Sequence, residues 1–125
     1  MNLEELGRRV VACPRWRWMP GMTILGSKGR RVVVIGLSNT PEATSGMNIR
    51  AIEPNELPDL SSPATLGCLL HLVREAYKSR FGLMVVSAQT NIRGEWYCNP
   101  NSGGPKAKWH ATEAEALVVA LEAAP

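Results

Sequence analysis

The alternation of apolar and polar residues predicts a helix at the start of the chain. In the segment 2–13, NLEELGRRVVAC, Asn2 precedes Glu5 by three residues, which is the pattern of a capping box. Pro14 ends this segment, because the residue before a proline is disfavoured in a helical conformation. The apolar residues that recur at helical spacing, and that we expect to face a core, are Leu3, Leu6 and Val10.

Two further helices are predicted where a cap precedes an apolar stripe. Ser62 is a favourable N-cap and Pro63 suits the first helical position, so a helix is expected to begin there. Thr112 and Glu115 form a second capping box in front of EAEALVVALEA. The expected buried residues are Leu66, Leu69, Leu70, Val73 and Tyr77 in the first of these helices, and Ala114, Leu117, Val118 and Leu121 in the second.

Five segments have the composition of β-strands. They are rich in β-branched and aromatic residues, or they alternate apolar with polar positions, and turn residues separate them. The segment 38–48, SNTPEATSGMN, is predicted to be a loop because small and polar residues dominate it. The predicted strands are 23–26, 31–37, 49–53, 82–89 and 94–100.

The order of these elements is α-β-β-β-α-β-β-α, without strand–helix–strand alternation. Such an order favours an α+β fold with a mainly antiparallel sheet of about five strands and three helices packed on it, an αβα sandwich. The length of 125 residues suits a single domain spanning 1–125, which can form a core without metal or disulfide staples.

The chain resembles small uncharacterised phage and prophage proteins with an αβα sandwich domain. The shared features are the capped helix in PDLSSPATLGCLLHLVREAY, the tryptophan-bearing hairpin sequence EWYC and the closing Ala-rich helix in ATEAEALVVALEAAP. The N-terminal helix leading into a tryptophan-containing segment is similar too. The resemblance covers residues 2–22 and 57–125, with a looser match over 23–56. It implies the fold and a phage origin. The family carries no assigned chemistry, so the resemblance implies no catalytic residue.

Composition and cysteine content predict a cytoplasmic protein, and the resemblance to phage proteins implies that the cytoplasm is that of a bacterial host. No apolar run approaches the roughly 18 residues that a membrane helix needs, and the N-terminal residues lack the apolar stretch of a signal peptide. The cysteines Cys13, Cys68 and Cys98 are odd in number and widely spaced, unlike a secreted disulfide framework. We therefore expect reduced thiols and no membrane partner.

Charge is distributed unevenly along the chain, although the net charge is only +3. Residues 1–50 contain eight Lys and Arg against three Glu, which gives +5, whereas residues 51–125 contain six basic and eight acidic residues, which gives −2. Between Leu6 and Pro41 there are seven basic residues and no acidic one. This basic segment favours an anionic partner by general electrostatics.

The chain lacks a recognisable catalytic motif. The stretch from Gly21 to Lys28 has the glycine spacing of a phosphate loop but reads Ser-Lys where the motif needs Lys-Ser or Lys-Thr, and the turn around Ser38 lacks the second glycine of a nucleophile elbow. No close-spaced ligand pair supports a zinc site, and no paired carboxylates suggest hydrolysis. The dispersed ligand types are Cys13, Cys98, His71 and His110. We expect no enzyme, no metal and no cofactor.

The stretch CPRWRWMPGM, residues 13–22, is the strongest candidate for an interaction surface. In an extended segment, Trp16 and Trp18 point to one face and Arg15 and Arg17 to the other. The tryptophans either pack inward as structure or lie at the surface, where aromatic and arginine side chains are typical of hot spots. Trp109, after a Gly-rich loop, has the same two interpretations. The candidate patch comprises Arg15, Trp16, Arg17, Trp18, Lys28, Arg30, Arg31 and Trp109.

These features predict a non-enzymatic phage or prophage accessory protein that binds a host or phage protein, and inhibition of a host defence is one form of that role. The alternative is a nucleic-acid-binding module that uses the basic N-terminal half. A weaker alternative is a small enzyme of unknown chemistry. Salt dependence separates the first two hypotheses, because contacts with phosphates release counterions and weaken steeply as salt rises. The sequence does not determine the oligomeric state.

Overall fold

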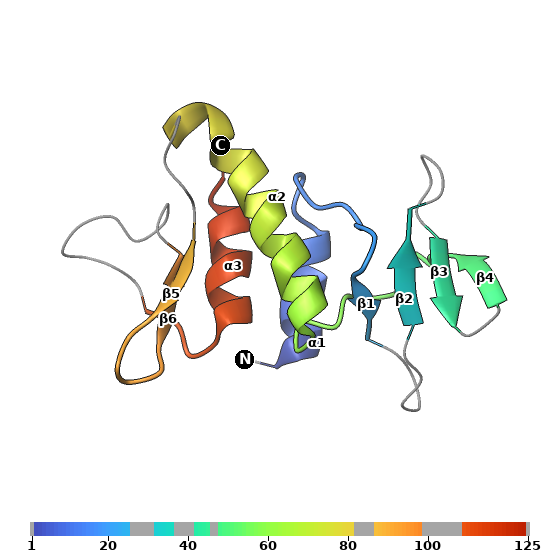
Figure 1. The fold of residues 1–125 in the computed structure, drawn as a ribbon, viewed down its shortest axis with the longest axis horizontal. Coiled ribbons are helices and arrows are strands. Elements are labelled where there is room, and N and C mark those ends of the chain that lie inside the picture. Colours follow the sequence, from blue (N-terminus) through green and yellow to red (C-terminus); the bar gives the residue numbers. More distant parts are fainter. Residues whose placement is uncertain are drawn as a thin grey trace.

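The computed structural model describes residues 2–25, 32–36, 42–45, 48–81, 87–98 and 109–124. These ranges contain three helices and six strands (Figure 1). The helices are α1 (Leu3–Val11), α2 (Pro63–Phe81) and α3 (Glu113–Glu122). The strands are β1 (Thr23–Ile24), β2 (Val32–Ile35), β3 (Glu42–Ser45), β4 (Asn48–Ala51), β5 (Ala88–Thr90) and β6 (Trp96–Cys98).

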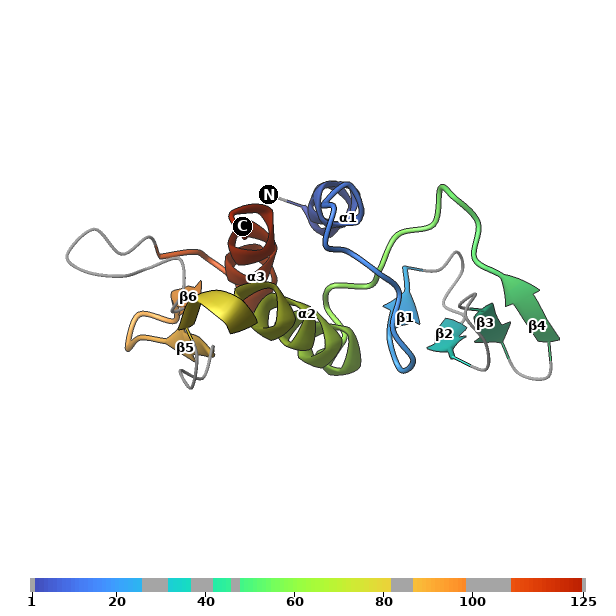
Figure 2. The same ribbon diagram turned by 90° about the horizontal axis from the view of Figure 1, so that it is seen from above.

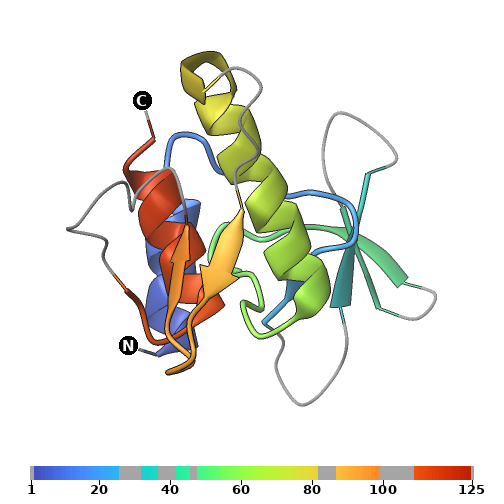
Figure 3. The same cartoon turned by 60° about the vertical axis from the view of Figure 1, so that its left-hand side comes forward.

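The helices lie between two antiparallel sheets. Figures 1 and 2 show the sheet β1-β2-β3-β4 on one side of the helical layer and the β5–β6 hairpin on the other. Figure 3 shows the hairpin against the face of α3 that points away from the larger sheet. The predicted α+β class with antiparallel pairing and three helices is confirmed. In the described residues, however, the strands number six and form two sheets, where about five in one sheet were expected.

β3 lies within the segment 38–48 that was predicted to be a loop, so that prediction is wrong for residues 42–45. β3 pairs with β2 through Val34↔Ala43 and with β4 through Ala43↔Arg50, and it is therefore an interior strand. The sequence EATS contains a single β-branched residue, and local propensity gives little sign of a strand there. Pairing on both sides and the complete burial of Ala43 stabilise it instead.

The predicted capping signals are confirmed at α1 and α3. The side-chain oxygen of Asn2 accepts the backbone N–H of Glu5 at 2.7 Å, and the hydroxyl of Thr112 accepts that of Glu115 at 3.2 Å. α2 begins at Pro63 as expected. Each cap satisfies an N–H group that the first helical turn leaves without a partner. Local sequence therefore determines where these helices begin.

The buried face of α2 is displaced from the predicted stripe. Leu69, Leu72 and Val73 are buried, whereas Leu66 and Leu70 are only half-buried. All of these side chains belong to or pack against one buried apolar cluster, which also includes residues of the larger sheet and of α1 and α3.

Contacts at both ends of α2 explain this displacement. Near its start, the hydroxyl of Thr65 accepts the backbone N–H of Thr23 in β1 at 2.9 Å. Three turns later, the hydroxyl of Tyr77 donates to the carbonyl of Ala120 in α3 at 2.9 Å. α2 thus packs against β1 on one side and α3 on the other, which widens and rotates the face that is removed from solvent.

Parts of the predicted strands fall outside the described residues, namely positions 26, 31, 37, 82–86 and 99–100. Among the helices that are described, none is both long enough and apolar enough to span a lipid bilayer.

Candidate functional site

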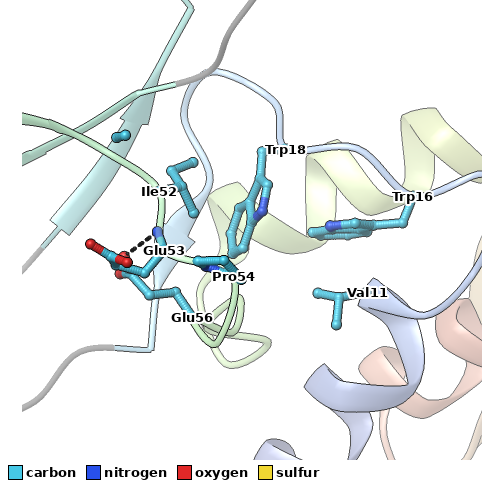
Figure 4. Close-up of a pocket in the computed structure, with 8 residues that line it drawn as sticks. Val11, Trp16, Trp18, Ile52, Glu53, Pro54 and Glu56 are labelled. Carbon is cyan, nitrogen blue, oxygen red and sulfur yellow. Dashed lines mark hydrogen bonds between the residues drawn. The ribbon is translucent and has the colours of Figure 1, made fainter.

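A pocket of about 350 Å³ lies between the end of α1, the chain segment that follows α1, and the connection from β4 to α2 (Figure 4). We call it the tryptophan pocket. In Figure 4, the rings of Trp16 and Trp18 border the same space as Val11, while Ile52 and Pro54 approach from the opposite side. The residues that line it are Val11, Trp16, Trp18, Ala51, Ile52, Glu53, Pro54 and Glu56.

The two tryptophans lie on the irregular segment 16–19 that joins α1 to the larger sheet. A turn after α1 directs the chain across the molecule, with the N–H of Trp16 donating to the carbonyl of Cys13 at 3.0 Å. The centroids of the Trp16 and Trp18 rings are 5.4 Å apart and the ring planes meet at 76°, an edge-to-face arrangement that stabilises an aromatic pair. Both rings are half-buried and pack against the core. They therefore serve as structure and also border the pocket.

Arg15 and Arg17 are exposed, as the alternation predicted. A guanidinium nitrogen of Arg17 lies 2.7 Å from one carboxylate oxygen of Glu75 on α2, and His71 Nε2 lies 3.3 Å from the other oxygen. The hydrogen bond from Arg17 lowers the pKa of Glu75, so this carboxylate is charged at neutral pH. Arg17 thus pairs the tryptophan-bearing segment with α2.

A side-chain network holds the opposite wall of the pocket. The two carboxylate oxygens of Glu56 accept from the guanidinium of Arg50, one of them at 2.8 Å, and the backbone N–H of Glu53 donates to Glu56 Oε1 at 2.8 Å. The Arg50 hydrogen bonds lower the pKa of Glu56. Charge-assisted hydrogen bonds of this kind are stronger than neutral ones. The loop that carries Ile52 and Pro54 is therefore held in place before any ligand arrives.

The indole nitrogen of Trp16 is buried and has no hydrogen-bond partner. Among the buried side-chain nitrogen and oxygen atoms of the described residues, it is the only one in this condition. Leaving a buried donor unpaired costs about 1–3 kcal/mol, and native proteins seldom do so.

Trp109 does not line the tryptophan pocket. Its ring makes an edge-to-face contact with Tyr97 of β6, with centroids 4.6 Å apart and planes at 79°. The next residue, His110, pairs through its backbone with Trp96. Trp109 therefore belongs to the hairpin side of the molecule, while Trp16 and Trp18 lie between α1 and the connection from β4 to α2.

The basic part of the candidate patch is only partly described. Lys28, Arg30 and Arg31 lie outside the described residues. Two other arginines of the basic segment form ion pairs: Arg8 pairs with Glu4 on the same helix, and Arg9 of α1 pairs with Glu122 of α3. Together with Arg17, three of the described arginines in this segment thus face carboxylates of the protein itself.

The cysteine and histidine side chains are dispersed. No group of three or more His, Cys, Asp or Glu residues in the described ranges is placed to hold a metal ion. Cys13, Cys68 and Cys98 are not joined in disulfide bonds. Burial raises the pKa of Cys98 to about 12 and also raises that of Cys13, which makes both poor nucleophiles at neutral pH.

Gly36, the first residue of the partial nucleophile-elbow pattern, has a structural role. A Cβ atom at this position would lie 2.4 Å from Cγ of Pro20, so a larger residue would fit only if the ring of Pro20 or the backbone shifted. The other half of that pattern, including Ser38, lies outside the described residues.

Sequence reasoning identified the two tryptophans but missed the rest of the pocket. Val11 was assigned to the first helix without a role, and the segment 51–56 was treated partly as a strand end and partly as a connection. Glu53 and Glu56, with Pro54 between them, form a composition that is common in turns, so this stretch of sequence does not indicate a binding pocket. Comparison with models of protein families, with curated proteins and with solved structures gives no match to this chain.

Proposed function

We propose that this chain is a non-enzymatic binding protein and that the tryptophan pocket is where it engages a partner protein. The observation that carries the proposal is the combination of two half-buried tryptophans in edge-to-face contact and a mostly apolar lining in one pocket. Specific binding sites are concave and mostly apolar, with few polar groups that fix orientation. Tryptophan is also enriched among residues that contribute most to protein–protein affinity.

The charges around the pocket support a protein partner over a nucleic acid. Arg17, beside the tryptophans, is paired with Glu75, and the opposite wall carries Glu53 and Glu56. Nucleic-acid binding needs cations that can exchange counterions for phosphates, and carboxylates at the rim oppose it. Stacking on bases also needs an aromatic face that is open to the ligand. The rings of Trp16 and Trp18 are instead in edge-to-face contact with each other.

The role in a phage or prophage rests on the sequence resemblance described above. Within that proposal, the partner is a protein of the host or of the phage, and interference with a host defence is one specific form. The bacterial cytoplasm is the compartment in which such a partner would be met.

The proposal can be tested by a pull-down from a bacterial lysate, in which the wild-type chain and two variants are each immobilised. Pro54→Arg places a long charged side chain on an exposed position of the pocket wall, and Trp109→Ala removes a tryptophan outside the pocket. We expect Pro54→Arg to lose a partner that wild type and Trp109→Ala both retain. Circular dichroism melts check that each variant is folded.

Nuclease treatment and a salt series complete this test. A protein partner should remain bound after nuclease digestion and should weaken little as salt rises. Capture that disappears with nuclease, or falls by orders of magnitude with salt, would establish the nucleic-acid alternative instead. Capture that is equal for wild type and Pro54→Arg would place the binding surface elsewhere.

A further inference from the structure

The outer edge of β4 is open. The larger sheet has the order β1-β2-β3-β4, so β4 is one of its two end strands. Figures 1 and 2 show β4 at the end of the molecule opposite the β5–β6 hairpin, with no other labelled element beyond it. Among the described residues, none pairs with the outer side of β4. Such an edge presents a row of backbone N–H and C=O groups with which another strand can pair.

The chain itself closes two other sheet edges. Residues 57–59 run along β1, and the N–H of Leu25 donates to the carbonyl of Leu57 at 2.7 Å. Beyond β6, Trp96 and His110 exchange two backbone hydrogen bonds of 2.7 Å. The remaining end strand, β5, exposes only polar side chains. Within the described ranges, β4 is therefore the end strand that combines an uncovered edge with an exposed apolar side chain, that of Ile49.

The β4 edge also lacks several features that prevent pairing in other proteins. Natural edge strands are protected by lysine, by proline or by a bulge. β4 contains neither lysine nor proline, and its register with β3 is continuous from Glu42↔Ala51 to Ser45↔Asn48. Its one charged side chain, Arg50, donates to Glu56 of the same chain, with Nη2 2.8 Å from Oε2. The charge that would repel a second strand is thus compensated within the protein.

An apolar side chain lies in the middle of this edge strand. Ile49 is 56% exposed, whereas Ile24 at the other end of the sheet is 4% exposed. β4 spans only four residues, so the hydrogen bonds of a strand pair would be few and apolar contact would have to add to them. A strand added outside β4 would place a side chain directly beside Ile49 on the same face of the sheet.

We propose that β4 of a second copy of this chain pairs with β4, antiparallel to it, so that the sheet continues across a two-fold axis at Ile49. The same strand then supplies the missing edge for both copies, as a two-fold interface does. This interface is separate from the proposed function, because Ile49 does not line the tryptophan pocket.

The charge of β4 selects the register of this pair. With Ile49 opposite Ile49 of the second copy, Arg50 lies opposite Asn48, which is uncharged. A register centred on Arg50 would place two guanidinium groups directly opposite one another, and like charges at such positions destabilise a strand pair. The Ile49-centred register instead joins two exposed apolar side chains, and this is the source of its stability.

The test measures the mass of the purified chain by sedimentation equilibrium over a series of concentrations. We expect a dimer that dissociates on dilution. Ile49→Asp places two carboxylates opposite each other and should weaken dimerisation at least about tenfold. Ile92→Asp is the matched control, because Ile92 is fully exposed in the turn between β5 and β6, and it should dimerise like the wild type. Circular dichroism melts of the dilute variants check that both are folded.

Cysteine cross-linking tests the register directly. In antiparallel strands the Cα atoms of directly opposite residues are about 4.5–5.5 Å apart, which is within the span of a disulfide. In a Cys68→Ser background, mild oxidation of Ile49→Cys should therefore give a covalent dimer. Ile92→Cys in the same background should remain largely uncross-linked.

A chain that stays monomeric at every concentration would overturn the inference. A dimer that Ile49→Asp and Ile92→Asp weaken equally would do the same, and so would a dimerising Ile49→Cys variant that forms no cross-link. Lysate capture at the tryptophan pocket is measured separately, so the loss of either result leaves the other in place.

Discussion

The thiol of Cys98 shows how burial changes the reactivity of a single side chain. It is buried in β6, and burial raises its pKa to about 12, whereas Cys68 on α2 is half-buried. Since the thiolate is the reactive species, very little of Cys98 is in the reactive form at neutral pH.

Cys98 should therefore resist a thiol reagent such as Ellman's reagent in the native protein, and Cys68 should react first. Raising the pH should speed the reaction of Cys98 because its thiolate population grows. Removing Cys68 by Cys68→Ser should abolish the first phase, and all remaining thiols should react together in denaturant. If Cys98 reacted as fast as Cys68 in the folded state, the burial of β6 would be wrong.

Two adjacent leucines of α2 test the displaced buried face. Leu69 has no exposed surface and Leu70 is half-buried, although the sequence predicted both to face the core. We expect Leu69→Ala to lower the free energy of unfolding by about 2–5 kcal/mol, because it removes buried methyl groups and leaves a cavity. Leu70→Ala is the matched control and should cost clearly less. Urea unfolding measures both, and equal losses would restore the predicted stripe.

At the scale of elements, the cap of α3 can be tested by two substitutions at one position. Thr112→Ala removes the oxygen that accepts the N–H of Glu115 and should cost about 0.5–2 kcal/mol of stability. Thr112→Ser keeps the hydroxyl and should stay close to wild type. Chemical denaturation distinguishes the two, and equal stability of the alanine and serine variants would show that the cap contributes nothing.

The helix starts and five of the six strands in the described residues, β1, β2, β4, β5 and β6, were predicted from local signals, whereas β3 and the buried face of α2 depend on distant partners and were not. Asn2, Pro63 and Thr112 act within one turn of chain, so their effect is visible in sequence. β3 becomes a strand only because β2 and β4 lie on both sides of it. The buried face of α2 is set by β1 at one end and α3 at the other, and neither contact follows from apolar periodicity.

The candidate site illustrates the same limit at the scale of the whole molecule. The alternation of Trp16 and Trp18 with exposed arginines could be predicted, because it needs only the geometry of an extended segment. The pocket could not, since its second wall is the turn around Pro54, and the fold alone brings that turn opposite Trp18. The ion pair of Arg17 with Glu75 could not be predicted either, because the basic residues around Arg17 have no acidic residue near them in the sequence.

The position of the helices between two sheets raises the question of whether both sides unfold together. One cluster of buried side chains contains Ile24 and Val34 from the larger sheet as well as Cys98 from the hairpin. Such a continuous core should unfold in one transition, as most domains below about 150 residues do. The four tryptophans provide reporters, because Trp16 and Trp18 lie at the pocket whereas Trp96 and Trp109 lie at the hairpin.

Two variants make these reporters independent. With Trp96 and Trp109 both replaced by Phe, the remaining fluorescence follows the pocket, and with Trp16 and Trp18 both replaced by Phe it follows the hairpin. In each variant, fluorescence and far-UV circular dichroism should give the same urea midpoint, because a single core transmits the loss of any part to the rest. A hairpin signal that melts at a lower urea concentration than the circular dichroism signal of the same variant would instead show two units. The prediction of one domain over residues 1–125 would then be wrong, and binding at the tryptophan pocket could persist after the hairpin had unfolded.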